Sequence, residues 1–401
     1  FNHIISGNML DNIDQDIIIL LIDNPFRSMN DIAKVLEIPY SNIKTRISKL
    51  KENGYIRKDN KIIDPVLGER IVTESIGIYD YNSLGLIRQH VIFYNIPNYE
   101  TLINLERFCD IHPYTKFRVQ LLSSSFAFYA QFDFPLIIIS EMEELYQHLC
   151  ELYEIPTFTK ITASELITIK PNLFYWSKLN DYWDIINKSS PNQNPTMMKY
   201  FWNKYLTEKK ENKLDFSDIS THEKDLVKLN ELYTKLIREL TINGNVGITE
   251  LASIYNRDKS TISRHITFIK ENYVKSGKLF FNPSEFKINS FRIISGELDS
   301  NILDKNNFLN FFSTQEFPFY GYIVCNNDKF LFYLEANQNQ IQELYHFLWK
   351  NTKPASLKIH ELLLQSTYTY HFYNGNYKED GTFNIDRQYF FDDPLTSINN
   401  N

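Results

Sequence analysis

Polar and basic side chains of the kinds that contact nucleic acids cluster between residues 41 and 58. The segment SNIKTRISKLKEN begins with a serine and an asparagine and carries lysines and an arginine at short intervals. An asparagine or arginine can form two hydrogen bonds with one base edge, whereas lysines mainly contact phosphates. The candidate contact residues of this segment are Ser41, Asn42, Lys44, Thr45, Arg46, Ser48, Lys49 and Lys58.

A second segment of the same kind follows about 219 positions later. STISRHITFIKEN at 260–272 aligns without gaps on SNIKTRISKLKEN, so that Ile43 and Ile47 fall on Ile262 and Ile266. Internal repetition of this sort indicates two copies of one structural unit. The candidate contact residues of the second copy are Lys259, Ser260, Thr261, Ser263, Arg264, Lys270 and Lys278.

The local charge of both segments is opposite to that of the whole chain. Residues 44–61 hold seven basic and two acidic side chains, 7 − 2 = +5, and residues 257–278 hold six and two, 6 − 2 = +4, in a chain of net charge −7. Local positive charge favours phosphate contacts, whereas the overall negative charge argues against indiscriminate binding to nucleic acids or membranes. A charged helix face is often only a solvated surface. Here the local charge favours double-stranded DNA as the partner.

The elements that would position these side chains are three helices between residues 10 and 56 and a wing after them. DQDIIILLIDN predicts the first helix, SMNDIAKVLEI the second with Ser28 as its N-cap, and the third begins at Ser41 and ends near Gly54. YIRKDNKIIDP predicts a two-stranded hairpin that turns at Asp59 and Asn60. An aliphatic stripe in the third helix would be buried and would leave the polar face outward; it consists of Ile43, Ile47 and Leu50.

Behind each basic segment the chain repeats a strand and helix order of βαββαβ. This order is typical of a ferredoxin-like sandwich, in which two helices lie on an antiparallel sheet. The apolar strands HVIFYNI and FRIISGEL are predicted to join the two sheets face to face. The expected fold class is therefore α+β, with two winged helix-turn-helix domains and two ferredoxin-like βαββαβ domains in tandem.

The domain boundaries follow from these patterns and from shifts in composition. A first winged helix is predicted at 10–65, a ferredoxin-like domain at 83–172, a second winged helix at 223–283 and a second ferredoxin-like domain at 287–373. Residues 173–222 are rich in Pro, Asn and Lys and predict a linker with one or two short helices. Residues 374–401 are rich in Asn and Asp and predict a mobile tail, although RQYFF within it could dock.

LDNIDQDII at 10–18, IPYSNIKTRISKLKENGYI at 38–56 and IIDP at 62–65 resemble the winged helix-turn-helix of the Lrp/AsnC family. The βαββαβ pattern resembles that family's effector and oligomerisation domain. The resemblance implies a cytoplasmic transcription regulator that dimerises through its sheet domains. In the second copy LNELYTKLI replaces the family's opening motif. Members that bind amino acids usually have a turn with Gly and Asp between the second and third strands. This chain has SSSF at 123–126 and NNDK at 326–329 in those places. The resemblance therefore implies no ligand residues in this sequence.

Together these features predict a sequence-specific DNA-binding transcription regulator built as a covalent pseudo-dimer. Because the two exposed helices differ in sequence, the two half-sites on DNA need not match. An unidentified small-molecule effector and homodimerisation through the ferredoxin-like domains complete the expected partners. The aromatic residues that could enclose such an effector are better explained as core and interface packing; they are Phe93, Tyr94, Phe128, Tyr129, Phe332 and Tyr333.

Two alternatives remain. Degenerate winged helices can bind proteins, which would make the chain an adaptor. Siroheme decarboxylases resemble the same plan and use paired basic and histidine residues in the sheet domain, for which the candidates here are Arg88, His90, Lys116 and Arg118. The sequence otherwise has no motif of an enzyme, a cofactor or a metal site, and its three cysteines lie far apart. No apolar run is long enough for a membrane span, and a cytoplasmic protein is expected.

Overall fold

The computed structural model describes residues 10–57, 60–64, 68–72, 74–163, 165–169, 197–208, 226–283, 288–315, 317 and 319–399. The chain divides into two compact units. The first, called the helical unit, holds residues 10–79 and 239–283, and the second, called the sheet unit, holds the other described residues.

The first winged helix contains the three predicted helices. They are α1 (Asn12–Asp23), α2 (Met29–Leu36) and α3 (Tyr40–Glu52). Ser28 is the N-cap of α2, as predicted, and its side chain accepts a hydrogen bond from the Asp31 backbone. The third helix begins one residue before the predicted Ser41, after Pro39. The aliphatic stripe of α3 is buried as predicted, so its polar face lies outward.

The second copy has three helices in the same order, followed among the described residues by one strand. It consists of α9 (Glu231–Ile242), α10 (Ile248–Ile254), α11 (Lys259–Asn272) and β9 (Ser276–Leu279). Ile262, Ile266 and Ile269 of α11 are buried at the positions that align with the stripe of α3. Asp258 caps α11 and accepts a hydrogen bond of 2.7 Å from the Thr261 backbone N–H.

The wing of the first copy differs from the prediction. Its hairpin pairs β1 (Asn60–Asp64) with β2 (Gly68–Val72), with Asp64 opposite Gly68, so Asn60 lies in a strand and not at the predicted turn. The segment before it, predicted as the first wing strand, pairs with the second copy instead: Ile56 forms a bridge with Phe281, and the Arg57 N–H donates to the Phe280 carbonyl at 2.9 Å. Tertiary pairing thus outweighs the local turn signal.

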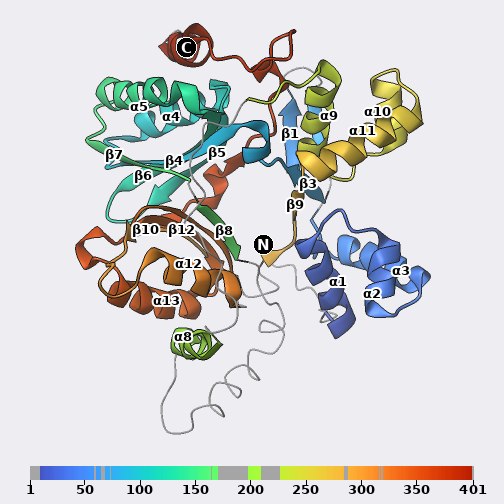
Figure 1. The fold of residues 1–401 in the computed structure, drawn as a ribbon, viewed down its shortest axis with the longest axis horizontal. Coiled ribbons are helices and arrows are strands. Elements are labelled where there is room, and N and C mark those ends of the chain that lie inside the picture. Colours follow the sequence, from blue (N-terminus) through green and yellow to red (C-terminus); the bar gives the residue numbers. More distant parts are fainter. Residues whose placement is uncertain are drawn as a thin grey trace. The chain divides into compact units, whose positions relative to one another are not determined.

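A shared ribbon joins the two winged helices within the helical unit. β3 (Ser75–Ile78) pairs antiparallel with β9, and Gly77 lies opposite Gly277 (Figure 1). A Cβ atom on Gly77 would stand 2.7 Å from the Leu240 carbonyl oxygen, and one on Gly277 would stand 2.6 Å from Cγ of Pro25. The glycines therefore permit a close approach that side chains would prevent.

The sheet unit contains both predicted βαββαβ patterns. The first comprises β4 (Leu86–Tyr94), α4 (Tyr99–Ile111), β5 (Thr115–Leu122), β6 (Phe126–Pro135), α5 (Ile139–Leu152) and β7 (Thr157–Thr162). The second comprises β10 (Ser290–Glu297), α12 (Lys305–Thr314), β11 (Tyr320–Asn326), β12 (Lys329–Ala336), α13 (Gln338–Asn351) and β13 (Lys358–Leu362). Their strand orders, β7-β4-β6-β5 and β13-β10-β12-β11, are the same. The predicted α+β class and ferredoxin-like topology are confirmed.

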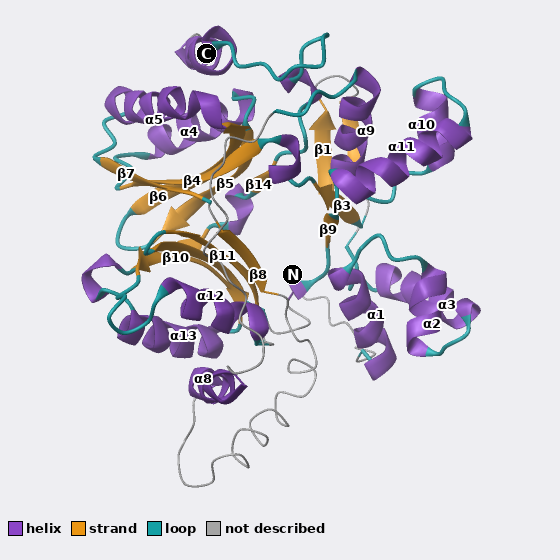
Figure 2. Ribbon diagram, viewed as in Figure 1, coloured by secondary structure: helices purple, strands orange, loops and turns teal. Residues whose placement is uncertain are grey.

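The two patterns share strands and a core. β5 pairs with β13, and β8 (Glu165–Ile169) leaves the first pattern to pair with β11 of the second. Aliphatic and aromatic side chains from both sheets form one buried cluster between them; it includes Ile92, Tyr94, Val119, Leu121, Tyr129, Ile293, Val324, Leu331, Tyr333 and Leu362. Helices α4 and α5 lie outside one sheet, and α12 and α13 lie outside the other (Figure 2).

Additional helices cover both outer layers. α8 (Met197–Glu208), from the predicted linker, places Trp202 against Phe311 and Phe347 with ring centroids 5.0 and 5.5 Å apart. The C-terminal segment continues through β14 (Tyr368–Thr369), which pairs with β5, to a π-helix (Gln388–Asp392) and α14 (Asp393–Asn399). The rest of the predicted linker lies outside the described residues.

The C-terminal segment is docked, in contrast to the predicted mobile tail. Phe390 is fully buried, with its ring centroid 5.6 Å from that of Tyr114. Arg387 forms an ion pair with Glu144 of α5 at 2.7 Å. The aromatic residues of RQYFF thus outweigh the polar composition around them, because each buries a large apolar area.

Replacing Phe390 with alanine should lower the free energy of unfolding of the sheet unit by about 3–5 kcal/mol, since a fully buried aromatic ring would leave a cavity. Urea unfolding followed by near-UV circular dichroism measures this. Tyr373→Ala is the control, because Tyr373 is an aromatic residue of the same segment that is 46% exposed. A Phe390→Ala variant as stable as this control would show that the segment does not dock.

Candidate nucleic-acid interface

Helix α3 presents most of its predicted contact residues to solvent. The exposed side chains are Ser41, Asn42, Lys44, Thr45, Ser48 and Lys49. They lie opposite the buried stripe because residues three and four apart share a helix face. The first two stand in the first turn of α3, where a helix that enters the major groove reaches base edges. Lys44 and Lys49 are placed for phosphates.

Arg46 has a different position from the other predicted residues. Its guanidinium lies 2.7 Å from carboxylate oxygens of both Asp11 and Asp14, at the start of α1. The hydrogen bond that Arg46 donates to Asp11 is the main reason that the pKa of Arg46 is raised. Its Nε also donates to Asn42 Oδ1 at 3.1 Å, which leaves the Asn42 amide nitrogen as the donor toward a base. Arg46 therefore braces α3 against α1 and orients Asn42.

Helix α11 exposes a smaller set. Lys259, Ser260 and Arg264 are exposed, whereas Thr261 and Ser263 are half-buried. The hydroxyls of Ser260 and Thr261 donate to the capping carboxylate of Asp258 at 2.5 and 2.7 Å. These hydrogen bonds, led by the one from Ser260, lower the pKa of Asp258. The N-terminal turn of α11 thus carries a fixed negative charge that α3 lacks.

Lys270 turns toward the interior of the helical unit. Its Nζ lies 4.4 Å from the ring centroid of Phe26 and 3.5 Å from the Gly244 carbonyl oxygen, and burial lowers its pKa. The equivalent position in α3 is Lys51, whose Nζ pairs with Glu74 at 2.6 Å. Both lysines directly follow the last buried residue of their helix, a signal that places them at the edge of the buried face. Of the remaining two predicted residues, Lys278 is half-buried in β9 and Lys58 lies outside the described residues.

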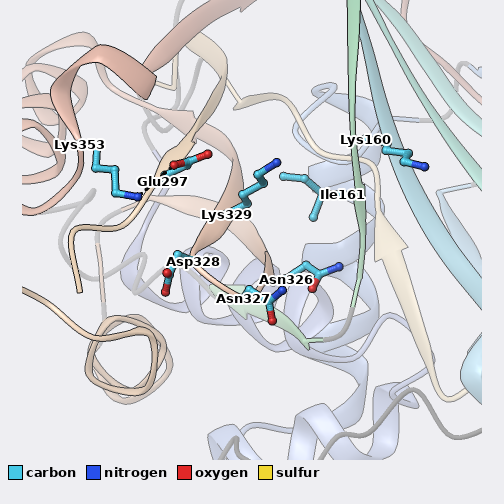
Figure 3. A pocket seen from close by; sticks show the side chains of 8 residues that line it. All are labelled: Lys160, Ile161, Glu297, Asn326, Asn327, Asp328, Lys329 and Lys353. Atoms are coloured by element: carbon cyan, nitrogen blue, oxygen red, sulfur yellow. Dashed lines mark hydrogen bonds and ion pairs between the residues drawn. The ribbon is translucent and has the colours of Figure 1, made fainter.

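The sheet unit has a groove lined by lysines where β7 approaches the second sheet. Two adjoining cavities of about 340 and 480 Å³ share Lys160 and Lys329. In Figure 3, the ammonium of Lys329 lies between Glu297 and Ile161, and no described carboxylate pairs with it. Lys353 is paired with Glu297 at 3.2 Å. An unpaired ammonium beside a cavity can bind an anion.

The aromatic residues considered as an effector lining are packed in the core. Phe93, Phe128, Tyr129, Phe332 and Tyr333 are all buried, at 7% exposure or less. Tyr94 alone among the six borders the lysine groove, and Lys358 Nζ lies 3.9 Å from its ring centroid. The other five are explained by core and interface packing, which is the explanation that the sequence favours.

The basic and histidine cluster of the sheet unit is brought together, but carboxylates occupy both arginines. Arg88 donates two hydrogen bonds of 2.7 Å to Asp133, and Arg118 contacts Glu106 and Asp110. His90 is fully buried, and burial lowers its pKa to about 3. Burial likewise lowers the pKa of Lys116 to about 7, and its Nζ donates to the Tyr370 carbonyl at 2.9 Å. Of these contacts, the one from Lys116 to Tyr370 joins the first βαββαβ pattern to the segment that follows the second.

Other kinds of site are absent from the part of the chain that the structure describes. No group of three or more His, Cys, Asp or Glu side chains there is arranged to hold a metal ion. None of the described helices combines the length and the apolar character that crossing a membrane requires.

Comparisons with known proteins agree with the N-terminal geometry. Residues 10–57 match a family model described as winged helix-turn-helix DNA-binding. Over 57 residues the chain is 39% identical to an uncharacterized HTH-type transcriptional regulator of Pyrococcus furiosus. The matched region is 14% of this chain and 38% of the relative's length. The predicted N-terminal winged helix-turn-helix is therefore confirmed.

Solved structures with similar folds span the two kinds of protein that the sequence resembles. An AsnC family transcriptional regulator from Agrobacterium tumefaciens is 18% identical with a TM-score of 0.27, over 39% of this chain and 91% of that one. The siroheme decarboxylase NirDL is 12% identical with a TM-score of 0.48, over 97% of this chain and 100% of that one. At these identities and scores, neither similarity assigns a function.

Proposed function

We propose that the protein is a sequence-specific DNA-binding transcription regulator. The observation that carries this proposal is the outer face of α3, where six exposed polar and basic side chains stand on a segment that matches a DNA-binding winged helix-turn-helix. Such a face supplies both base-edge donors and phosphate contacts. The overall negative charge of −7 keeps binding to unrelated DNA weak.

The contact residues divide by chemistry. In the first copy Asn42, with Ser41 and Thr45, reads bases, while Lys44, Ser48, Lys49 and Lys58 contact phosphates. In the second copy Arg264 reads a base, and Lys259, Ser260, Thr261, Ser263 and Lys278 support it. Arg46 and Lys270 act as braces because their charged groups already have partners.

The chain acts as a covalent pseudo-dimer in this proposal. The two ferredoxin-like patterns share one buried cluster, and the shared ribbon of β3 and β9 joins the two winged helices. Because α3 and α11 differ in their exposed residues and only α11 has a capping carboxylate, the operator should be asymmetric. Regulation in the cytoplasm and further homodimerisation through the sheet unit belong to the same proposal.

The test is selection of bound fragments from the host genome followed by salt titration. The Lys44→Ala/Lys49→Ala variant should bind every selected fragment more weakly, and the slope of log affinity against log salt should fall by about 1.8, since two phosphate contacts are lost. Asn42→Ala should lose about 1–3 kcal/mol of preference at one or two base pairs. Lys350→Ala/Lys378→Ala is the charge-matched control, because both of these lysines are exposed in the sheet unit.

The alternatives give different results in the same experiment. If no fragment is enriched and the Lys44→Ala/Lys49→Ala variant behaves like its control, the DNA-binding proposal fails and the protein-interaction adaptor takes its place. A siroheme-decarboxylase-like activity would require bound tetrapyrrole, which visible absorbance of the purified protein detects. The carboxylates on Arg88 and Arg118 argue against that alternative.

The proposed effector site of the sheet unit is the lysine groove. Lys329, which pairs with no carboxylate among the described residues, favours a small anionic molecule. Thermal-shift measurements with the twenty amino acids, citrate and inorganic phosphate test this site.

A further inference from the structure

A cavity of about 330 Å³ lies inside the helical unit, where the α1–α2 loop meets α3 and the second winged helix. Its volume is at the lower end of the range for small-molecule sites in proteins. Most of its wall is aliphatic, and its residues are Leu21, Pro25, Phe26, Arg27, Ser28, Met29, Ile32, Ile47, Lys51, Ile56, Glu74, Asn245 and Leu279. The four most buried of the aliphatic side chains are at most 6% exposed.

The cavity has one polar group without a partner. Arg27 Nε is buried, and no described residue accepts its hydrogen bond. The same guanidinium is held in place through Nη2, which lies 3.0 Å from Asp23 Oδ2. Buried donors in native proteins are almost always paired, so an unpaired donor beside a cavity indicates a missing acceptor.

The charges around the cavity are balanced. Arg27 is paired with Asp23, and Lys51 is paired with Glu74 at 2.6 Å. A charged ligand would therefore bring an uncompensated charge into a largely apolar space, which is costly. A neutral molecule that carries one acceptor satisfies Arg27 without this cost.

We propose that this cavity is a binding site for a small uncharged molecule with an apolar body and one carbonyl or hydroxyl oxygen. The oxygen accepts the hydrogen bond from Arg27 Nε, and the body packs against Ile32, Ile47 and Ile56. The volume suits roughly ten non-hydrogen atoms, given that one water occupies about 30 Å³ in the liquid. This site is separate from the lysine groove, which favours anions.

The position of the cavity ties the ligand to both winged helices. Ile47 and Lys51 belong to α3, whereas Leu279 belongs to β9 of the second copy. Phe26, which lines the cavity, packs closely against Gly244: a Cβ atom on Gly244 would stand 2.6 Å from the Phe26 ring. A bound molecule contacts both copies at once and so stabilises their pairing.

The experiment compares three probes of similar size on the full chain: acetophenone, which has a carbonyl oxygen, ethylbenzene, which has no acceptor, and benzoate, which is charged. Isoleucine methyl NMR reports where each probe binds. Acetophenone should shift the methyl signals of Ile32, Ile47 and Ile56 and leave those of Ile262 and Ile269 unchanged. It should bind about tenfold more tightly than ethylbenzene or benzoate, because only it satisfies Arg27. Equal affinity for acetophenone and ethylbenzene, or tighter binding of benzoate, would overturn the proposal.

Two substitutions provide matched variants. Ile47→Phe fills the cavity and should abolish acetophenone binding, whereas Ile266→Phe, at the aligned position of α11, should leave it intact. Arg27→Met should reduce the affinity for acetophenone to that of ethylbenzene. Acetophenone binding that survives Ile47→Phe would place the ligand elsewhere and contradict the proposal.

A second part of the experiment tests regulation. Only this part rests on the proposed DNA-binding function. Saturating acetophenone should strengthen binding to a selected DNA fragment in the parent protein and have no effect in Ile47→Phe. The NMR arm needs no DNA, so failure of DNA binding and failure of the cavity site are distinguished. Unchanged DNA affinity with a filled cavity would overturn the regulatory part of the inference.

Discussion

The free energy of unfolding of the sheet unit should fall steeply as the pH is lowered from about 6.5 to 4. His90 and His112 are fully buried, and burial lowers the pKa of each to about 3. In the unfolded chain the same groups titrate near 6.5. Between these values the unfolded state binds more protons, so stability is lost as the pH falls. Each histidine contributes about 1.4 kcal/mol per pH unit, about 2.7 kcal/mol for the two.

Urea unfolding at half-unit pH intervals measures this dependence. His90→Gln should lower the slope by about 1.4 kcal/mol per pH unit, because the amide retains a hydrogen-bonding group for Tyr129, which lies 2.6 Å from His90 Nδ1, and does not titrate. A stability that is constant between pH 6.5 and 5 would contradict the expectation. So would an unchanged slope in His90→Gln.

Replacing Asp133 with alanine should destabilise the sheet unit by about 3–5 kcal/mol, because Arg88 would remain buried without its counter-charge. The side chains of Asp133 and Arg88 are only 2% and 11% exposed, and two hydrogen bonds of 2.7 Å join them. The other face of the guanidinium lies 4.5 Å from the ring centroid of Tyr81. Loss of the carboxylate would therefore leave a buried charge in a site of low polarity, which is costly.

The double replacement Arg88→Met/Asp133→Leu separates the ion pair from packing. Removal of both charges with apolar side chains of similar size should restore most of the stability lost in Asp133→Ala. Chemical denaturation of the parent and the two variants at pH 7 gives the comparison. If the double variant is as unstable as Asp133→Ala, the loss comes from shape and not from an unpaired charge.

The sequence predicted the exposed face of α3 well and its edges poorly. A helical period of 3.6 residues determines which side chains share a face, so Lys44 and Lys49 could be placed outward from Ile43 and Ile47 alone. The period does not reveal which residues distant in sequence lie beside the edge of the stripe. Arg46 meets Asp11, 35 residues earlier. That contact depends on how α1 packs on α3.

The wing and the C-terminal segment show the same limit. The Asp59-Asn60 turn signal is local, whereas the bridge between Ile56 and Phe281 joins residues 225 positions apart, 281 − 56 = 225. The polar composition of 374–401 predicted mobility, yet Phe390 finds a buried place beside Tyr114. Both βαββαβ patterns could be predicted because their strands and helices follow one another along the chain. The pairing of β8 with β11 of the second pattern could not be predicted, since periodicity does not specify which strands pair with each other.

The docked C-terminal segment has a consequence for how the protein is made. A ribosome completes the strands of the first βαββαβ pattern once residue 162 has emerged, but β13, β14 and α14 pair with or cover it only after residues 358–399 are synthesised. Until then the β5 edge of the nascent sheet and the outer face of α4 stay open, although domains generally fold as they emerge. An unpaired strand edge is prone to pair with another chain. Synthesis of residues 358–399, and not emergence of the first half, is therefore the step at which this fold closes, and a chain that stops before residue 358 keeps an open strand edge that is prone to aggregate.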